Sequence, residues 1–495
     1  MSVLLSAAPI LLFGVGLFYM FRLRGFYLFH PVRCMRLLFA YKPRGGISPF
    51  RALTVALAGT LGVGNIVGVA SALYFGGPGA VLWMLVSALV AMVLKYAEIT
   101  LAICHRRVTP EGRFTGGAPY YVGDCLARAG LPRAGKVLSA VFALLCLLNA
   151  LTMGSLLQVN AVAGAMENGF SLPPLVTGVG IALLAVVTVR GGAARISALT
   201  EKLVPLMTVG FLVVCTAVLI LRRERIPEAL VSIFEDALHP AAAGAGVGGF
   251  LLSKGVRYGV MRGLVSNEAG CGTAPMAHAA ARIDLPARQG LFGLVEVFVD
   301  TVLLCTVTAL CILVSDSGPE AYGEDTVRTA QAAFSSVLGA WAGGFFAVAM
   351  LLFGVATVIC WAHYGMTCAD YLGGGRTAPR AVYVGALAVS TVLGAVTAPT
   401  PAWTIADGAI ALMTVLNLLI LLLMHREVES ETHRLLPWHG SRGGGISCGG
   451  GDEGPNEGAD PDGFCGTRNP CILQSRISNT ARKDAIARRL PRSRS

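Results

Sequence analysis

The chain has 495 residues, of which 55% are hydrophobic and 14% charged, and its formal net charge is +11. A mean hydropathy of +0.67 is too high for an ordinary soluble protein and indicates an integral membrane protein. The positive charge lies mostly in loops that flank apolar stretches and in the C-terminal tail, so it is no evidence for nucleic-acid binding.

Stretches of about 20 apolar residues, the length that crosses a bilayer, recur along the chain. The first is followed by Arg22 and Arg24 and has no basic stretch before it, which predicts an uncleaved anchor and not a secretory signal. The seventh is the least regular, because Lys254, Arg257 and Arg262 interrupt it. The eleven predicted spans are residues 2–21, 50–75, 79–103, 137–164, 173–189, 202–221, 241–262, 290–314, 338–364, 381–398 and 403–424.

The charges of the loops predict the topology. Lys and Arg dominate the loops after spans one, three and five. In contrast, the loop after span eight carries Asp316, Glu320, Glu324 and Asp325 against Arg328. We therefore expect a multi-pass protein of the cell membrane, with its N-terminus outside and its C-terminus in the cytoplasm.

Span two contains a segment that a plain membrane helix would avoid. Residues 58–68 include Gly59, Gly62, Gly64, Gly68 and Asn65. Glycine weakens a helix by roughly 1 kcal/mol relative to alanine. A helix that breaks in the bilayer exposes backbone groups that must face protein or a polar solute. The segment therefore predicts a binding site; the alternative is close packing of helices at small residues.

The ten spans after the first divide into two sets of five, and an odd number per set forces any repeat to be inverted. Span seven, the first of the second set, is also rich in glycine, at residues 244–249. Interrupted spans at corresponding positions indicate the central site of a transporter. We predict an N-terminal helix and basic loop at 1–49, five-helix halves at 50–221 and 222–424, and a disordered cytoplasmic tail at 425–495.

Two segments carry a family resemblance. Residues 62–70, with the sequence GVGNIVGVA, and residues 262–275, with the sequence RGLVSNEAGCGTAP, are similar to those of the alanine or glycine:cation symporter family. The resemblance runs from about residue 1 to about 425. It implies an all-α, leucine-transporter-like fold of about 11 helices, a 5+5 inverted repeat after one extra helix. It also implies Na⁺-coupled uptake of a small neutral amino acid, alanine or glycine.

The predicted substrate site lies between spans two and seven. Backbone N–H groups around Gly62 and Gly64 are expected to bind the substrate carboxylate. The resemblance places a substrate-facing glutamine at Gln158, although a hydrogen bond between helices would also explain this residue. Phe250 and Trp361 are expected to wall the side-chain end of the pocket, and packing is the alternative for both. The full substrate set is Thr60, Gly62, Gly64, Gln158, Phe250 and Trp361.

A Na⁺ site is predicted next to the break in span two. Asn65 offers an amide oxygen for the ion or a brace across the break, and Asp300 is a charge inside a span, which indicates function. Asp300 could ligate Na⁺, titrate, or pair with a basic residue of span seven. The resemblance adds the carbonyls of Ala58 and Leu61 and the hydroxyl of Thr357. The full Na⁺ set is Ala58, Leu61, Asn65, Asp300 and Thr357.

Two departures from the family pattern leave the coupling ion open. The family usually has Thr at the position of Val63 and Ser at that of Ala356. The loss of a hydroxyl at 356 removes one hard oxygen ligand. Coupling to protons, or a Na⁺ site completed by water or Ser390, therefore remains an alternative.

Six further residues receive structural interpretations. Lys95 and Glu98 lie one turn apart and predict a structural ion pair. Asn267 and Glu268 are expected to follow span seven on the cytoplasmic side, as a helix cap or gate without substrate contact. His278 and Cys271 have no partners at metal-ligand spacing, and the 13 cysteines form no C-x-x-C pair, so we expect buried reduced thiols.

These patterns favour a monomeric secondary transporter over other functions. A channel would need a filter loop or a ring of like charges, and an enzyme would need a nucleophile–base or metal constellation. A primary pump would need a nucleotide-binding motif, and no G-x-x-x-x-G-K-[ST] occurs. The expected partners are the amino acid, the coupling ion and the bilayer, with no organic cofactor.

Overall fold

The computed structural model describes residues 2–41, 45–110, 112–238 and 254–436. The contacts of residues 1–435 make them one compact unit. Among the described residues of this unit, the strands are β1 (Arg107–Val108) and β2 (Phe114–Thr115), which form an antiparallel hairpin, and an isolated bridge joins Ile47 and Ala281; the other regular elements described are helices. Helices satisfy their own backbone hydrogen bonds, as the bilayer interior requires. The prediction of a helical membrane protein is confirmed.

Seven helical segments of the described chain are long and apolar enough to cross a membrane, and the bent pair α4–α5 makes an eighth. Two shorter apolar helices, Ala8–Arg22 and Pro174–Arg190, have the same character. Part of the predicted seventh span lies outside the described residues, so the total of eleven stays a prediction. The seven segments are α6 (Ala80–Cys104), α8–η2–α9 (Pro132–Leu151, Thr152–Leu156, Leu157–Phe170), α11 (Gly192–Leu221), α17–η4–α18 (Pro286–Val297, Phe298–Cys305, Thr306–Leu313), α20 (Trp341–Gly373), α21 (Thr377–Val396) and α22 (Thr400–Leu423).

The remaining helices include the two halves of each interrupted span and several short connecting helices. Many begin with proline in the first turn, where its missing N–H and fixed φ do no harm. They are α1 (Ser2–Arg22), α2 (Phe26–Phe29), α3 (Pro31–Phe39), α4 (Pro49–Thr60), η1 (Val63–Asn65), α5 (Val67–Gly76), α7 (Ala118–Arg128), α10 (Pro174–Arg190), η3 (Arg223–Arg225), α12 (Ile226–Ala237), α15 (Lys254–Asn267), α16 (Pro275–His278), α19 (Thr326–Leu338) and α23 (His425–Leu435).

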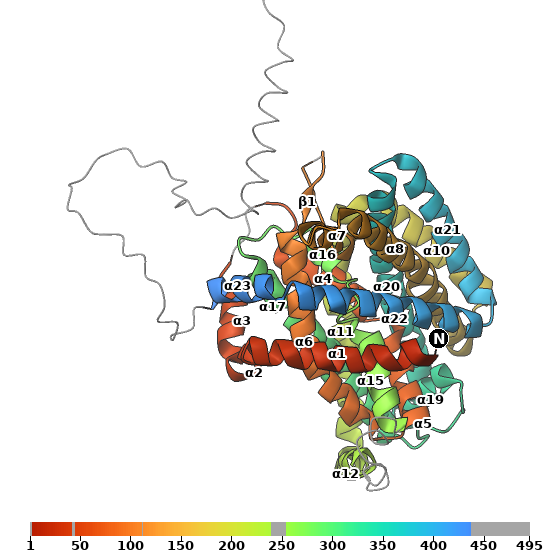
Figure 1. Ribbon diagram of the computed structural model, residues 1–495. Helices are drawn as coiled ribbons and strands as arrows, with labels where there is room; N and C mark the ends of the chain where they lie inside the picture. The colour runs from red at the N-terminus through yellow and green to blue at the C-terminus, as the bar shows by residue number, and fades with distance from the viewer. Residues whose placement is uncertain (1, 42–44, 111, 239–253, 437–495) are drawn as a thin grey trace, which may run out of the picture. The chain divides into compact units, whose positions relative to one another are not determined.

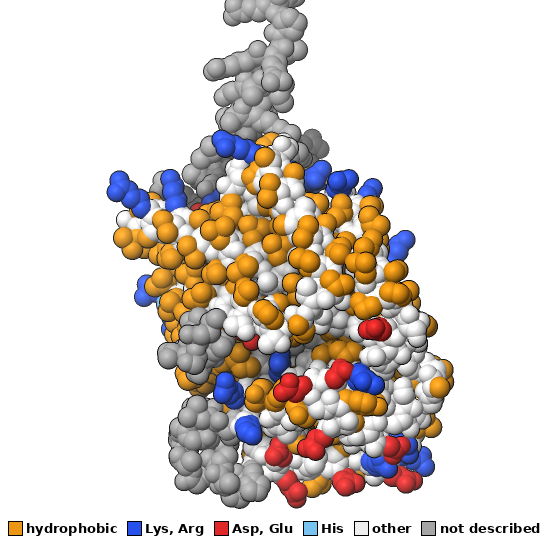
Figure 2. All heavy atoms as spheres, turned by 90° about the vertical axis from the view of Figure 1, so that its right-hand side faces the viewer, with side chains coloured by type: hydrophobic (Ala, Val, Ile, Leu, Met, Phe, Trp, Pro, Cys, Tyr) orange, Lys and Arg blue, Asp and Glu red, His pale blue; other side chains and the backbone are white. Residues whose placement is uncertain are grey.

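Burial separates central helices from peripheral ones. In the most apolar stretch of α20, 78% of the residues are buried, against 28% in α21 and 33% in α11. The peripheral helices expose large apolar side chains such as Leu183, Val213 and Val382. Figure 2 shows such side chains over much of one face, with Asp and Glu gathered toward one end, while Lys and Arg lie at both ends. This surface suits a chain that faces lipid.

The two ends of the helical unit carry different elements. Helices α5, α12 and α19 lie toward one end, and α7, α16 and the hairpin lie toward the other (Figure 1). Helix α1 lies beside α22, where the Tyr19 hydroxyl donates to the Leu421 carbonyl oxygen at 2.6 Å.

The prediction of a disordered tail from residue 425 is wrong for residues 425–435, which form α23. Its acidic side chains pair with distant arginines: Arg22 Nε lies 3.0 Å from Glu429, and Arg128 Nη1 lies 2.9 Å from Glu427. Val428 and Leu435 are buried. Average composition missed this helix because its few apolar residues all lie on one side. Residues 437–495 lie outside the described part.

Candidate functional site

The predicted break in span two is present. Helix α4 ends at Thr60, a short 3₁₀ turn covers Val63–Asn65, and α5 begins at Val67, with a bend of 62° between the two halves. Gly62 adopts an extended backbone, with φ −113° and ψ −166°. The C-terminal end of α4 and the N-terminal end of α5 therefore meet inside the bundle, where their partial charges can act on a solute.

Two side-chain amides replace the hydrogen bonds that the break removes. The Gly62 N–H donates to Asn65 Oδ1 at 3.0 Å, and the Val63 N–H donates to Gln158 Oε1 at 3.1 Å. Gln158 in turn donates from Nε2 to the carbonyl oxygen of Met153, in the π-helical turn η2, at 3.2 Å. The interpretation of Asn65 as a brace across the break is what the structure shows. Gln158 joins span four to the same break.

Glycine at position 62 provides clearance. A Cβ atom there would lie 2.7 Å from Thr357 Oγ1 and 3.1 Å from Gln158 Oε1, whereas a Cβ at Gly64 would meet nothing within 4 Å. Because the φ of Gly62 is one that any residue adopts, only the close approach to α20 requires glycine. Gly64 instead leaves open space.

Asn65 also connects the break to Asp300 in the π-helical turn η4. Asn65 Nδ2 donates to Asp300 Oδ1 at 2.7 Å, and the hydroxyls of Ser266 and Thr301 donate to Asp300 Oδ2 at 2.8 and 2.7 Å. Asp300 has no ion pair with a basic group of the described residues, so one of the three alternatives for it, the pairing with a basic residue of span seven, is wrong. Amide and hydroxyl donors satisfy this carboxylate.

A second interruption follows α15. The helix ends at Asn267, residues 268–274 are not helical, and α16 begins at Pro275. Gly270 and Gly272 both have φ +77°, and Glu268 has φ +51°. A left-handed conformation is unusual for a glutamate and is typical of strained functional sites. The break predicted at 244–249 lies outside the described residues.

Glu268 is buried at this second interruption. The Thr273 hydroxyl donates to its Oε2 at 2.6 Å, and Trp361 Nε1 donates to its Oε1 at 3.1 Å. The Trp361 ring packs against Gly154, where a Cβ would lie 2.3 Å from it. The predicted span ends at residue 262, whereas the helix continues to Asn267, so Glu268 is buried inside the bundle and does not lie in an exposed loop. Its placement on the cytoplasmic side stays a prediction.

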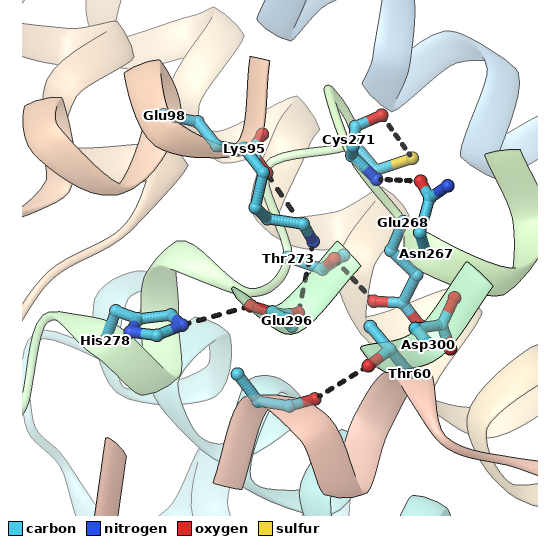
Figure 3. Close-up of polar contacts among 12 residues, drawn as sticks. Thr60, Lys95, Glu98, Asn267, Glu268, Cys271, Thr273, His278, Glu296 and Asp300 are labelled. Carbon is cyan, nitrogen blue, oxygen red and sulfur yellow. Dashed lines mark hydrogen bonds and ion pairs between the residues drawn. The ribbon is translucent and has the colours of Figure 1, made fainter. Parts of the chain in front are cut away.

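A charged cluster holds the second interruption from the other side. Glu98 Oε2 accepts from the Gly272 N–H at 3.1 Å and from Asn417 Nδ2 at 3.0 Å. Lys95 Nζ lies 3.7 Å from Glu98 Oε1 and 3.3 Å from Glu296 Oε1, which confirms the predicted pair of Lys95 and Glu98. His278 Nε2 lies 3.1 Å from Glu296 Oε2. Figure 3 shows His278, Glu296 and Lys95 as one connected row.

A cavity of about 500 Å³ lies between the two interruptions. Its inner part is lined by the first break, by Gln158 on α9 and by Ser266 and Glu268 at the second interruption. Its outer part is lined by Phe75 on α5, by the start of α19 and by the start of α22. The lining residues include Gly59, Thr60, Gly62, Val63, Gly64, Val67, Gly68, Ser71, Phe75, Gln158, Arg262, Ser266, Glu268, Glu324, Asp325, Trp403 and Asp407.

Residues 2–436 match the model of the sodium:alanine symporter family. The chain belongs to this family. A family member of Methanococcus maripaludis, named sodium/alanine symporter AgcS, is 36% identical over 86% of this chain and 92% of its own length. The probable sodium/glutamine symporter GlnT of Bacillus subtilis is 34% identical over 85% of each chain. A manganese transporter of Eremococcus coleocola aligns at a TM-score of 0.47 with 17% identity, over 77% of this chain and 79% of that one, too distant a likeness to indicate a substrate.

Membership of the sodium:alanine symporter family confirms the resemblance seen in the sequence. It makes the chain a member of a transporter family, which agrees with the expectation that it is not an enzyme. The relatives named above differ in the amino acid that their names give, alanine or glutamine. Family membership therefore leaves the substrate to be inferred from the site.

The structure places only part of the predicted site at the cavity. Thr60, Gly62, Gly64 and Gln158 line it. Trp361 is buried behind Glu268 and is not among the lining residues. Phe250 lies outside the described residues. The predicted Na⁺ residues are buried and do not line the cavity: Ala58, Leu61, Asn65, Asp300 and Thr357.

Two cavity residues, Ser266 and Glu268, were not predicted as site residues. A signal for them existed, because an acidic residue inside a membrane span indicates function. The signal was lost when three basic residues made the end of span seven look like a loop. The family motif itself, residues 266–270, forms the interruption.

Proposed function

We propose that the protein is a secondary active transporter that takes up a small neutral amino acid together with Na⁺ by alternating access, with a leucine-transporter-like fold. The cavity between two interrupted helices carries this proposal. Its glycine-lined inner part and its volume of about 500 Å³ suit alanine, glycine or serine together with water. Backbone dipoles at both breaks can bind the charged ends of a zwitterion.

A closed inner end favours a carrier over a pore. Below Thr60 and Glu268 the cavity meets residues that are buried and linked by hydrogen bonds, among them Asn65, Asp300 and Trp361. A passive pore would need a continuous path past them. In the orientation that we predict from loop charges, Glu324 and Asp325 at the mouth face the outside, so this state faces outward.

The proposed cation site is the group around Asp300. The carboxylate and the hydroxyl oxygens of Ser266 and Thr301 are hard ligands of the kind that Na⁺ prefers, and Asn65 Nδ2 orients the carboxylate by donating to Oδ1. Thr357 uses its hydroxyl to donate to the Phe353 carbonyl at 3.0 Å and has a lone pair left for an ion. Because Ala356 offers no hydroxyl, coupling to protons is the second candidate.

Uptake of labelled alanine into proteoliposomes tests the proposal. A Na⁺ gradient should drive accumulation, and gradients of Li⁺, K⁺ or protons separate the candidate ions. Gln158→Ala, which frees the Val63 N–H, and Asp300→Asn, which removes the buried charge, should each abolish gradient-driven uptake. Asp284→Asn, at an exposed carboxylate paired with Arg288, is the control and should transport normally.

Uptake that is indifferent to every gradient would contradict symport and favour a passive route. Wild-type uptake in both site variants would remove Gln158 and Asp300 from the site. Expression and thermal unfolding of each variant, compared with the wild type, distinguish lost transport from lost folding.

A further inference from the structure

Four buried carboxylates surround the second interruption. They are those of Glu98, Glu268, Glu296 and Asp300, each with at most 1% of the residue exposed. Among the described residues, Lys95 and His278 supply the only basic nitrogens within ion-pair distance of them. Even with His278 counted as a cation, two negative charges remain. An unpaired charge inside a protein in a bilayer is costly. These two negative charges should therefore be balanced by cationic groups when the transporter has bound its substrate and coupling ion.

The two positive groups are already committed to two of the carboxylates. Lys95 pairs with Glu98 and Glu296, and His278 pairs with Glu296. Glu98, Glu296 and His278 do not line the cavity. The carboxylates without an ion-pair partner are Glu268 and Asp300, and each is held by neutral donors.

Glu268 and Asp300 differ in what can reach them. Asp300 accepts hydrogen bonds from three side chains and is shut off from the cavity, whereas Glu268 lines the cavity. Each oxygen of Glu268 accepts one hydrogen bond from a described side chain, so lone pairs remain on both. Figure 3 shows Glu268 reaching toward Thr60 and Asp300, at the first break.

We infer that Glu268 binds the α-ammonium group of the substrate and so makes the transporter select amino acids over other small carboxylates. This inference rests on the proposed function. The hydroxyl-rich surroundings of Asp300 suit the metal ion, which leaves Glu268 for the ammonium. Trp361 and Thr273 are positioning residues, because they hold the carboxylate oxygens that receive it.

The partial charges at the ends of α15 and α5 agree with this orientation of the substrate. Glu268 directly follows the C-terminus of α15, a helix of 14 residues whose dipole adds negative potential there. Across the cavity, Gly64 and Val67 lie at the N-terminal end of α5, which favours an anion. A zwitterion placed between the two breaks therefore has its carboxylate at α5 and its ammonium at Glu268.

Binding to the purified full-length protein tests the inference, with labelled alanine displaced by unlabelled alanine or by lactate, which has a hydroxyl in place of the ammonium. Glu268→Gln should weaken alanine binding roughly tenfold to a hundredfold, because it removes a charged hydrogen-bond partner. Lactate binding should change less than about threefold, because lactate has no ammonium group and therefore no hydrogen bond to Glu268 that the substitution would remove. Glu268→Asp, which keeps the charge, should retain a preference for alanine. Glu320→Gln, at an exposed carboxylate that does not line the cavity, is the matched control and should bind as the wild type does.

Three outcomes would overturn the inference. Glu268→Gln could bind alanine as tightly as the wild type, or Glu268→Asp could lose alanine as Glu268→Gln does. Glu268→Gln could also lose alanine and lactate equally with a lowered unfolding temperature, which would show a structural role. A wild-type protein that binds no alanine would contradict the proposed function instead.

Discussion

The two interrupted helices are braced by different chemistry. At the first break, the amides of Asn65 and Gln158 accept hydrogen bonds from backbone N–H groups. At the second, the acceptor of the Gly272 N–H is Glu98, which belongs to an ion-pair cluster with Lys95 and Glu296. Neutral amides hold a break at any pH and cost little to bury once bonded, whereas a charged brace depends on every member of its cluster.

This difference indicates separate tasks for the two regions. The first break is braced by neutral amides and presents its helix ends to the cavity, while the Asp300 carboxylate lies behind Asn65; this suits a site that must bind and release a zwitterion. The charged second region fixes the backbone firmly on one side, through Glu98, and presents Glu268 on the other. At the first break, function depends on the space between Gly62 and α20. At the second, it depends on which buried carboxylates are paired with a positive charge.

The largest effect is expected from removing the clearance at the first break. Gly62→Ala places a Cβ 2.7 Å from Thr357 Oγ1, so α20 or the break must move, and uptake should fall by about tenfold or more for a shift of only about 1 Å. Gly164→Ala is the matched control, because its Cβ meets nothing within 4 Å and Gly164 does not line the cavity, so it should lower uptake much less. Initial uptake rates in proteoliposomes measure both. Equal rates in the two variants would contradict the role of clearance.

A smaller effect, on stability, is expected from breaking the charged brace. Glu98→Ala leaves Lys95 with one carboxylate and the Gly272 N–H without an acceptor, so the free energy of unfolding should fall by about 3 kcal/mol. Glu98→Gln keeps an acceptor and should lose less. Thermal unfolding in detergent reports the order of the variants. An unchanged unfolding temperature in Glu98→Ala would show that the cluster is not a brace.

The smallest effect is expected at a charged contact outside the spans. His105 lies between Asp124, 2.8 Å from Nδ1, and Glu427 of α23, 3.1 Å from Nε2. Burial alone lowers the pKa of His105, but hydrogen bonds to the two carboxylates outweigh it and raise the pKa above its ordinary 6.5. Burial likewise raises the pKa values of Asp124 and Glu427, but hydrogen bonds to His105 and the arginines lower both overall.

The pH dependence follows from these directions. The stabilisation by charged His105 is complete below pH 6.5 and is lost as the pH rises through the higher folded pKa. The contribution of the carboxylates is present above 4.5 and is lost in acid. We compare the unfolding temperatures of the wild type and of His105→Gln. The difference between them should be largest between pH 4.5 and 6.5 and should shrink above neutral pH. A constant difference from pH 5 to 9 would contradict this assignment.

The sequence by itself determined the parts of the protein that depend on composition and local pattern. Apolar runs identified the helices, the glycines of residues 59–68 located the first break, and the SNEAG motif identified the family. Local pattern failed for α23, whose apolar residues are few but lie on one face, and for span seven, where basic residues obscured a helix that continues to Asn267.

Only the tertiary structure decided which polar groups meet. Asn65 and Asp300 are 235 positions apart, and Glu268 and Trp361 are 93 apart, yet each pair is hydrogen-bonded. Separation along the chain carries no information about such contacts, because packing of distant helices creates them. The placement of Glu268 at the cavity, and of Lys95 with Glu98 and Glu296 behind it, depends on how α6, α15, α17 and α20 pack together. That packing determines which buried charges are paired and which remain for a ligand.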